Sequence, residues 1–230
     1  VRHAVDYVGA DADDILGVGV TVPGILDDEK QILISAPPLK AKNYDFTRLI
    51  SAIDYPVVVM NDARAEAYAD HWFNGKPEDE KIYIMLGEGV GGAYINASAI
   101  RNGVHNRGGE FGHMVIHPGG KQCLCGKKGC FEAYVSEKVL SSELDMTLDN
   151  FFELAAQGNK NNSNVLDEYM DNLALGINNI YTMMDCDIVL GGTVAPYLKQ
   201  YDNSIKERLV NDYSFDTDAD YLRISDGGGR

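Results

Sequence analysis

Cys123-Leu124-Cys125-Gly126-Lys127-Lys128-Gly129-Cys130 is the stretch of this sequence that decides its fold, together with Glu110-Phe111-Gly112-His113 shortly before it. One imidazole and three thiolates form the tetrahedral Cys₃His set that is typical of structural zinc, and the two glycines allow a tight turn around the ion. Three thiols without a ligand on such a loop would be prone to oxidation, so that alternative is weaker. The spacing therefore predicts a structural Zn²⁺ ion held by His113, Cys123, Cys125 and Cys130.

Length and composition favour a soluble, globular protein. The chain has 230 residues, of which 45% are hydrophobic and 24% are charged, enough for a sizeable core in one or two domains. No run approaches the roughly 18 apolar residues of a membrane span, and the first residues contain no signal-peptide core. We therefore expect a cytoplasmic protein without a membrane partner. Because the chain lacks an initial Met and ends in the polar, glycine-rich segment 225–230, we also expect it to be part of a longer protein.

The charge balance argues against nucleic-acid binding by these residues. A formal net charge of −15 would repel phosphate backbones, which are bound by clustered Lys and Arg side chains. Any contact with DNA would thus go through a segment absent from this chain. The fourth cysteine, Cys186, stands alone in an apolar context and is expected to be a core residue.

Strands alternate with helices along the chain, which predicts an α/β fold with two lobes. The polar segment 74–80 is the expected boundary, so the lobes would be residues 1–75 and 76–230. Predicted strands cover residues 15–22, 31–35, 56–60, 81–86, 92–96, 188–190 and 221–224. Predicted helices cover residues 45–53, 63–72, 132–144, 148–156, 163–184 and a stretch from 193 to about 211.

The pattern Glu-x-Gly-His followed by Cys-x-Cys-Gly-x-x-Gly-Cys-x-Glu resembles the signature of the ROK family of bacterial sugar repressors and sugar kinases. It is met here at Glu110, His113, Cys123, Cys125, Gly126, Gly129, Cys130 and Glu132. Further agreement comes from Val22-Pro23-Gly24-Ile25, Asn61-Asp62-Ala63, the glycine loop 87–92 and Leu190-Gly191-Gly192. The resemblance implies a two-lobed actin-like ATPase (ribonuclease H-like) fold, here with an incomplete smaller lobe. It also implies a sugar bound in the cleft and pairing as a homodimer.

From the same resemblance, the hydroxyl groups of a sugar would contact Asn61, Asp62, Glu110, His113 and Glu132. Carboxylates and amides fit this task, because they fix pairs of hydroxyl groups by directional hydrogen bonds. Zinc would hold Glu110 and Glu132 in place, since each lies close in sequence to a zinc ligand. If one ring nitrogen of His113 binds zinc, only the other can reach the sugar. Taken singly, each of these residues would more often be a solvated charge or a helix cap.

In kinases of the family, the aspartate that matches Asp62 acts as a general base toward the sugar hydroxyl. A helix N-cap is the alternative role for this residue. The kinases also carry a phosphate-binding Asp-x-Gly-Gly-Thr near their N-terminus, which this chain lacks, and Gly-Thr-Gly where it has Gly87-Glu88-Gly89. A carboxylate next to a triphosphate is repelled, so ATP use is in doubt. If nucleotide binding is retained, the resemblance assigns it to Gly87, Gly89, Gly191 and Gly192, with Mg²⁺.

The leading interpretation is the sugar-sensing effector domain of a ROK-family transcriptional regulator, similar to N-acetylglucosamine and xylose repressors. Such regulators carry a winged helix, which would lie outside this chain. The alternative is an ATP-dependent hexose kinase with Asp62 as base, and a third hypothesis is a zinc-stabilised scaffold without a working sugar site. The identity of the sugar cannot be deduced, because Ala36-Pro37-Pro38-Leu39 departs from the family's usual Pro-Asn-Leu.

Overall fold

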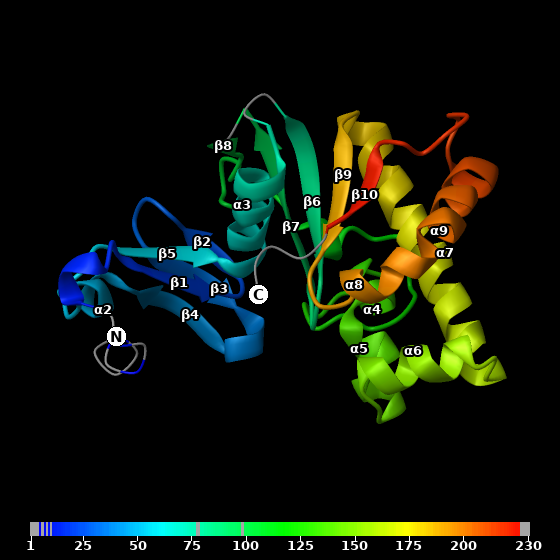
Figure 1. Ribbon diagram of the computed structural model, residues 1–230, viewed down its shortest axis with the longest axis horizontal. Coiled ribbons are helices and arrows are strands. Elements are labelled where there is room, and N and C mark those ends of the chain that lie inside the picture. The colour runs from blue at the N-terminus through cyan, green and yellow to red at the C-terminus, as the bar shows by residue number, and fades with distance from the viewer. Residues whose placement is uncertain are drawn as a thin grey trace. The chain divides into compact units, whose positions relative to one another are not determined.

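The computed structural model describes residues 5, 7, 9, 11–76, 79–97 and 99–225 (Figure 1). The chain folds as two compact units, Val1–Ala65 and Glu66–Arg230. They meet within the helix α3 (Asp62–Asn74), before the boundary expected from the polar segment 74–80, and the division into lobes at residue 75 stays a prediction. No helix in the described part of the chain is both long enough and apolar enough to cross a membrane.

The first unit contains two small sheets. Strands β1 (Val18–Val22) and β5 (Val57–Asn61) pair in parallel, and β2 (Ile25–Asp27), β3 (Ile32–Ala36) and β4 (Ala41–Asp45) form an antiparallel meander. Their shared core consists of apolar side chains that are almost fully buried: Val22, Leu26, Leu33, Ala36, Phe46 and Val59. The short helical elements are η1 (Ala12–Asp14), η2 (Pro37–Leu39) and α2 (Thr47–Ile50).

The expected helix over residues 45–53 forms only as α2, which begins at Thr47 with Phe46 at the N-cap position, while Asp45 ends β4. One carboxylate oxygen of Asp45 accepts a hydrogen bond of 2.8 Å from the Thr47 backbone N–H. Strand β4 just before it was not predicted, because most of its side chains are exposed and the segment has no apolar alternation. Its pairing with β3 depends on backbone hydrogen bonds, which leave no mark on the sequence.

The second unit is built on a five-stranded sheet in the order β10-β9-β6-β7-β8. Strands β6, β9 and β10 are parallel, whereas β7 and β8 continue the sheet in antiparallel fashion. Their bounds are β6 (Glu80–Leu86), β7 (Val90–Asn96), β8 (Ala99–Ile100), β9 (Asp187–Gly191) and β10 (Leu222–Ile224). The predicted hairpin at residues 81–96 and the strands near 188 and 222 are confirmed.

Both faces of this sheet are covered, so its strands are apolar along most of their length. On one face Tyr83, Ala93 and Val189 pack with Ala67 of α3. On the other face Ile82, Ile84 and Leu190 belong to the main core with the helices that Figure 1 labels α4 to α9. Those elements are α4 (Glu132–Val135), α5 (Glu137–Leu140), η4 (Ser142–Leu144), α6 (Leu148–Ala156), α7 (Lys160–Met184), α8 (Ala195–Leu198), η5 (Lys199–Tyr201), α9 (Asp202–Arg208) and the π-helical η6 (Leu209–Tyr213).

The single helix predicted over residues 132–144 is interrupted. Ser136 adopts an extended conformation between α4 and α5, with φ −72° and ψ 158°. The backbone N–H of Glu137 then donates a 2.7 Å hydrogen bond to the Gly87 carbonyl instead of continuing the helix. This break turns the start of α5 toward the loop between β6 and β7, a tertiary contact that helical periodicity does not reveal.

Candidate functional site

The structure brings together the four residues predicted to bind zinc. Their ligand atoms all lie within 4.8 Å of one another, with Cys125 Sγ 3.7 Å from Cys130 Sγ and Cys123 Sγ 3.9 Å from His113 Nδ1. Two sulfurs bound tetrahedrally at about 2.3 Å from zinc are roughly 3.8 Å apart, so the spacing matches this ion closely. Histidine comes from η3 (Phe111–His113), and the thiols come from the loop that leads into α4.

Glycines shape the loop around the cluster. Gly126 and Gly129 have φ angles of +86° and +82°, in the region that favours glycine. A Cβ atom at Gly129 would lie 1.7 Å from the carbonyl oxygen of His117, so no other residue fits there without moving the backbone. Burial raises the pKa of the Cys123 thiol, which means that a bound cation is needed to hold it as the thiolate.

Glu132 connects the zinc cluster with the glycine loop between β6 and β7. Its Oε1 lies 3.4 Å from Cys123 Sγ, and its Oε2 accepts a 3.1 Å hydrogen bond from the Val90 backbone N–H. A Cβ atom at Gly89 would approach the same Oε2 to 3.0 Å, so the loop passes close to the carboxylate. The Glu132 side chain thus lies between the predicted zinc ligands and the glycine loop.

Glu110 lies on the other side of the cluster. Its Oε2 is 3.7 Å from His113 Nε2, while His113 Nδ1 faces Cys123. With Nδ1 on the metal, the Nε2–H group would point toward the carboxylate, the arrangement that fixes the ring of many metal-binding histidines. Three of the five predicted sugar ligands, Glu110, His113 and Glu132, are therefore grouped around the cluster.

The other two predicted sugar ligands belong to the first unit and lie where β5 ends and α3 begins. The Asn61 side chain donates to the Gly24 carbonyl and accepts from the Arg64 backbone N–H, both at 3.0 Å, so it caps the helix. Asp62 accepts from the Ala63 N–H at 2.9 Å, and burial raises the pKa of its carboxyl group. The capping role considered from sequence is thus filled mainly by Asn61. A site shared with the residues of the second unit remains a prediction.

The four glycines predicted for nucleotide binding meet at the carboxyl ends of the parallel strands β6 and β9. Gly87 and Gly89 form the turn after β6, and Gly191 and Gly192 follow at the end of β9. Gly192 has a φ of +82°, and a Cβ atom there would lie 2.5 Å from the Leu86 carbonyl oxygen. Carboxyl ends of parallel strands are where α/β proteins usually bind ligands.

Two residues at this edge were missed by sequence reasoning. The hydroxyl of Thr193 donates a 2.5 Å hydrogen bond to Glu137 Oε2, and the Glu137 backbone N–H binds the Gly87 carbonyl at 2.7 Å. Glu137 thus links the two glycine loops. Together with Glu132 on the Val90 amide, it places carboxylates on two hydrogen-bond donors at this edge of the sheet. The only signal in the sequence was Thr193 directly after the glycine pair.

This chain is similar in sequence to known repressors. The xylose repressor of Bacillus subtilis is 28% identical over 83% of this chain, which corresponds to 51% of that protein. The chain spans about half the length of these curated relatives.

Solved structures share the mixed α/β fold. A ROK family transcriptional regulator, a homologue of the E. coli MLC protein, superposes with a TM-score of 0.80 at 22% identity, covering 97% of this chain and 61% of the other. A ROK family glucokinase from Streptomyces griseus in complex with glucose and AMPPNP gives a TM-score of 0.79 at 23% identity, covering 99% of this chain and 83% of the other. The family model described as ROK matches residues 1–224. This chain belongs to the ROK family.

Proposed function

We propose that this chain is the sugar-sensing domain of a ROK-family transcriptional regulator, with zinc as a structural ion. One observation carries the preference for a sensor over a kinase. The donors at the carboxyl edge of β6 and β9 are occupied by the chain's own carboxylates, Glu132 on the Val90 amide and Glu137 on the Thr193 hydroxyl. A third acid, Glu88, lies in the turn itself. Three carboxylates at this edge would repel the negative charges of a triphosphate.

In this proposal a hexose-type sugar binds between the lobes of an actin-like fold, residues 1–75 and 76–230. Asn61, Asp62, Glu110, His113 and Glu132 bind its hydroxyl groups. Zinc supplies no chemistry to the sugar but holds the loop that carries the second set of ligands. The short links from Glu132 to Cys123 and from Glu110 to His113 support this role.

In a sensor, the binding of sugar must change the binding of DNA. We infer that bound sugar shifts the balance between two arrangements of the lobes, because it binds one arrangement more tightly. A DNA-binding segment outside this chain would respond to that shift in a cytoplasmic homodimer. The likeness to the xylose repressor supports this assignment, and the acidic composition of the chain is compatible with it.

The alternative is an ATP-dependent sugar kinase. Two observations favour it: the fold match to the Streptomyces griseus glucokinase, and the raised pKa of the half-buried Asp62 carboxyl group, which suits a general base. ATP and Mg²⁺ would then be bound near Gly87, Gly89, Gly191 and Gly192, and Glu137 would have to leave Thr193 first.

Calorimetry on the zinc-loaded protein separates these functions. Glucose, N-acetylglucosamine and xylose are titrated into the wild type, into Glu132→Gln and into the control Glu207→Gln, a charge change on the exposed face of α9. We expect one sugar to bind the wild type and the control equally, and Glu132→Gln at least about tenfold more weakly, because a charged hydrogen bond is lost. Rapid phosphorylation of that sugar with Mg²⁺-ATP would replace the sensor by the kinase. No heat with any sugar would leave only the scaffold hypothesis.

A further inference from the structure

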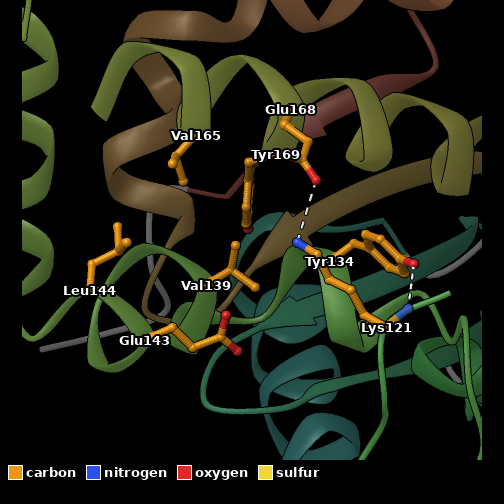
Figure 2. A pocket seen from close by; sticks show the side chains of 8 residues that line it. All are labelled: Lys121, Tyr134, Val139, Glu143, Leu144, Val165, Glu168 and Tyr169. Atoms are coloured by element: carbon orange, nitrogen blue, oxygen red, sulfur yellow. Dashed lines mark hydrogen bonds and ion pairs between the residues drawn. The ribbon is translucent and has the colours of Figure 1, made fainter. Parts of the chain in front are cut away.

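A pocket of about 170 Å³ lies in the second unit, beside the zinc loop (Figure 2). The pocket is lined by the stretch just before Cys123, by α4, α5 and η4, and by the first half of α7. None of the residues predicted to bind zinc, sugar or nucleotide lines this pocket. One water molecule takes about 30 Å³ of liquid, so the space accepts a small organic molecule.

The inner walls are apolar and rigid. Val139, Leu144 and Val165 contribute aliphatic surface, and the rings of Tyr134 and Tyr169 complete it. Both tyrosines are almost fully buried, and both hydroxyl groups are held. The Tyr169 hydroxyl donates to the Val135 carbonyl, and the Tyr134 hydroxyl accepts from the Lys121 N–H, each at 2.8 Å. A preformed apolar and aromatic wall is the usual basis of a small-molecule site.

The mouth of the pocket carries the charges. Lys121 Nζ lies 3.4 Å from Glu168 Oε1 and 5.0 Å from the centre of the Tyr134 ring, so one ammonium group already has both an ion pair and a cation–π contact here. Glu143 approaches from the other side of the pocket (Figure 2). Among the residues that the structure describes, no hydrogen bond or ion pair is found for its carboxylate. The lining therefore has one more carboxylate than ammonium groups.

The excess of one carboxylate in the lining favours a positively charged ligand. A phosphate or carboxylate would meet two acids, in a chain whose formal net charge is −15. A second ammonium group would instead balance Glu143, and its apolar stem would be covered by Val139 and Val165. The Lys121 ammonium group, paired with Glu168 and placed over the Tyr134 ring, shows that this lining already holds one ammonium group.

We propose that this pocket binds a small primary amine, with the ammonium group on Glu143 and a short apolar stem between α5 and α7. The site is independent of the proposed sugar site and does not rest on it. An amine bound there contacts Lys121, which leads into the zinc loop, and Tyr134, which follows Glu132 on α4. The chain would then receive a second small-molecule signal next to the loop that carries the sugar ligands.

The test is a titration of the zinc-loaded, ¹⁵N-labelled protein with benzylammonium chloride, followed by amide chemical shifts at constant ionic strength. Benzyl alcohol, of nearly the same shape but neutral, is the ligand control. We expect saturable shifts at Val139, Leu144 and Val165 with the amine, and clearly weaker binding of the alcohol. Glu143→Gln should weaken the amine about fivefold, the factor for one charged contact at a partly exposed site. Glu207→Gln should leave it unchanged.

A second variant keeps the test independent of charge. Val165→Phe fills the pocket from α7, and we expect it to abolish the shifts while circular dichroism shows the same helix content. The proposal is overturned if the amine gives no saturable shifts, if benzyl alcohol binds equally well, or if Glu143→Gln or a folded Val165→Phe variant keeps full affinity. Each of these outcomes leaves the sugar titrations unaffected, so failure here is distinct from failure of the proposed function.

Discussion

Asp70 is a buried carboxylate that joins three elements of the second unit, and its replacement by Asn tests how the sheet is held to α3. Its side chain is 1% exposed. It accepts hydrogen bonds from Lys81 Nζ on β6 at 3.2 Å, Arg223 Nη2 on β10 at 2.7 Å and Ser225 Oγ at 3.0 Å. Asn preserves the size of the side chain and one acceptor oxygen but removes the charge.

The expected loss in the free energy of unfolding follows from how exposed the side chains of Lys81 and Arg223 are. The Lys81 side chain is 4% exposed, so Asp70→Asn leaves a buried ammonium without its counter-charge. Breaking a buried pair in this way costs about 3–5 kcal/mol. Arg223 is 43% exposed and can be solvated, so it adds little. The matched control is Asp171→Asn, which breaks a more accessible pair with Arg208 on α9; Arg208 keeps Asp167 as a partner, so the cost should be less than about 1 kcal/mol.

The assay is urea denaturation of the zinc-saturated variants at pH 7, followed by far-UV circular dichroism. We expect the free energy of unfolding to fall by several kcal/mol in Asp70→Asn and hardly at all in Asp171→Asn. Equal effects of the two substitutions would refute the reasoning, because the buried pair and the more accessible pair would then contribute alike. A loss of cooperativity confined to Asp70→Asn would instead show that α3 has separated from the sheet before the rest unfolds.

The same carboxylate predicts a pH dependence. Burial alone would raise the pKa of Asp70, but the hydrogen bond from Arg223 and the charges of Arg223 and Lys81 outweigh it, so the pKa lies below the ordinary value of 3.8. A depressed pKa contributes stability that is complete above the unfolded value and is lost as the pH falls through the folded one. The difference between wild type and Asp70→Asn should therefore be constant from pH 7 to about pH 5 and shrink below about pH 4. A difference independent of pH down to pH 2 would contradict this assignment.

Two further predictions concern the zinc loop. Cys125→Ser should reduce bound zinc from about one ion per chain to a small fraction, measured by elemental analysis after dialysis, because the serine hydroxyl is a poor ligand; retention of zinc would show that the site does not need this thiol. Gly129→Ala should lower the thermal midpoint far more than Gly126→Ala, measured by calorimetry. Both positions have positive φ, but only at 129 does the added methyl meet backbone, at the His117 carbonyl.

The metal cluster could be predicted because its four ligands lie close together in the sequence. Four ligands within a short span, separated by glycines, specify both the ion and the turn, and the structure groups them as expected. Core strands were predictable for a similar reason: β6 and β9 are buried on both faces and appear in the sequence as apolar runs. Where most side chains on both faces are exposed and apolar alternation is missing, as in β4, the signal was absent.

The contacts that could not be predicted from the sequence depend on the register between strands that are far apart along the chain. Glu137 meets Thr193 only because β6 pairs with β9 so that Met85 lies opposite Gly191, which brings the two glycine loops to one edge. Neither residue carries a signature by itself, and helical periodicity even favoured a continuous helix through Ser136. The break there is decided by a hydrogen bond to the loop after β6.

The predicted zinc ligands and the glycine loop between β6 and β7 lie close together, with the Glu132 side chain between them. Glu132 has one oxygen near Cys123 and the other on the Val90 amide, so the position of its carboxylate is set from both sides. Phe131, directly before it, is fully buried and packs against Gly176 of α7, where a Cβ atom would lie 2.2 Å from its ring. The start of α4 therefore cannot shift freely when the ion leaves. We expect the loop from Cys123 to Gly129 to move when zinc leaves, because Cys123 beside the Glu132 carboxylate is then no longer fixed by the ion. On the proposed function, we expect removal of the metal to weaken sugar binding, which the same calorimetric titration on metal-free protein would measure.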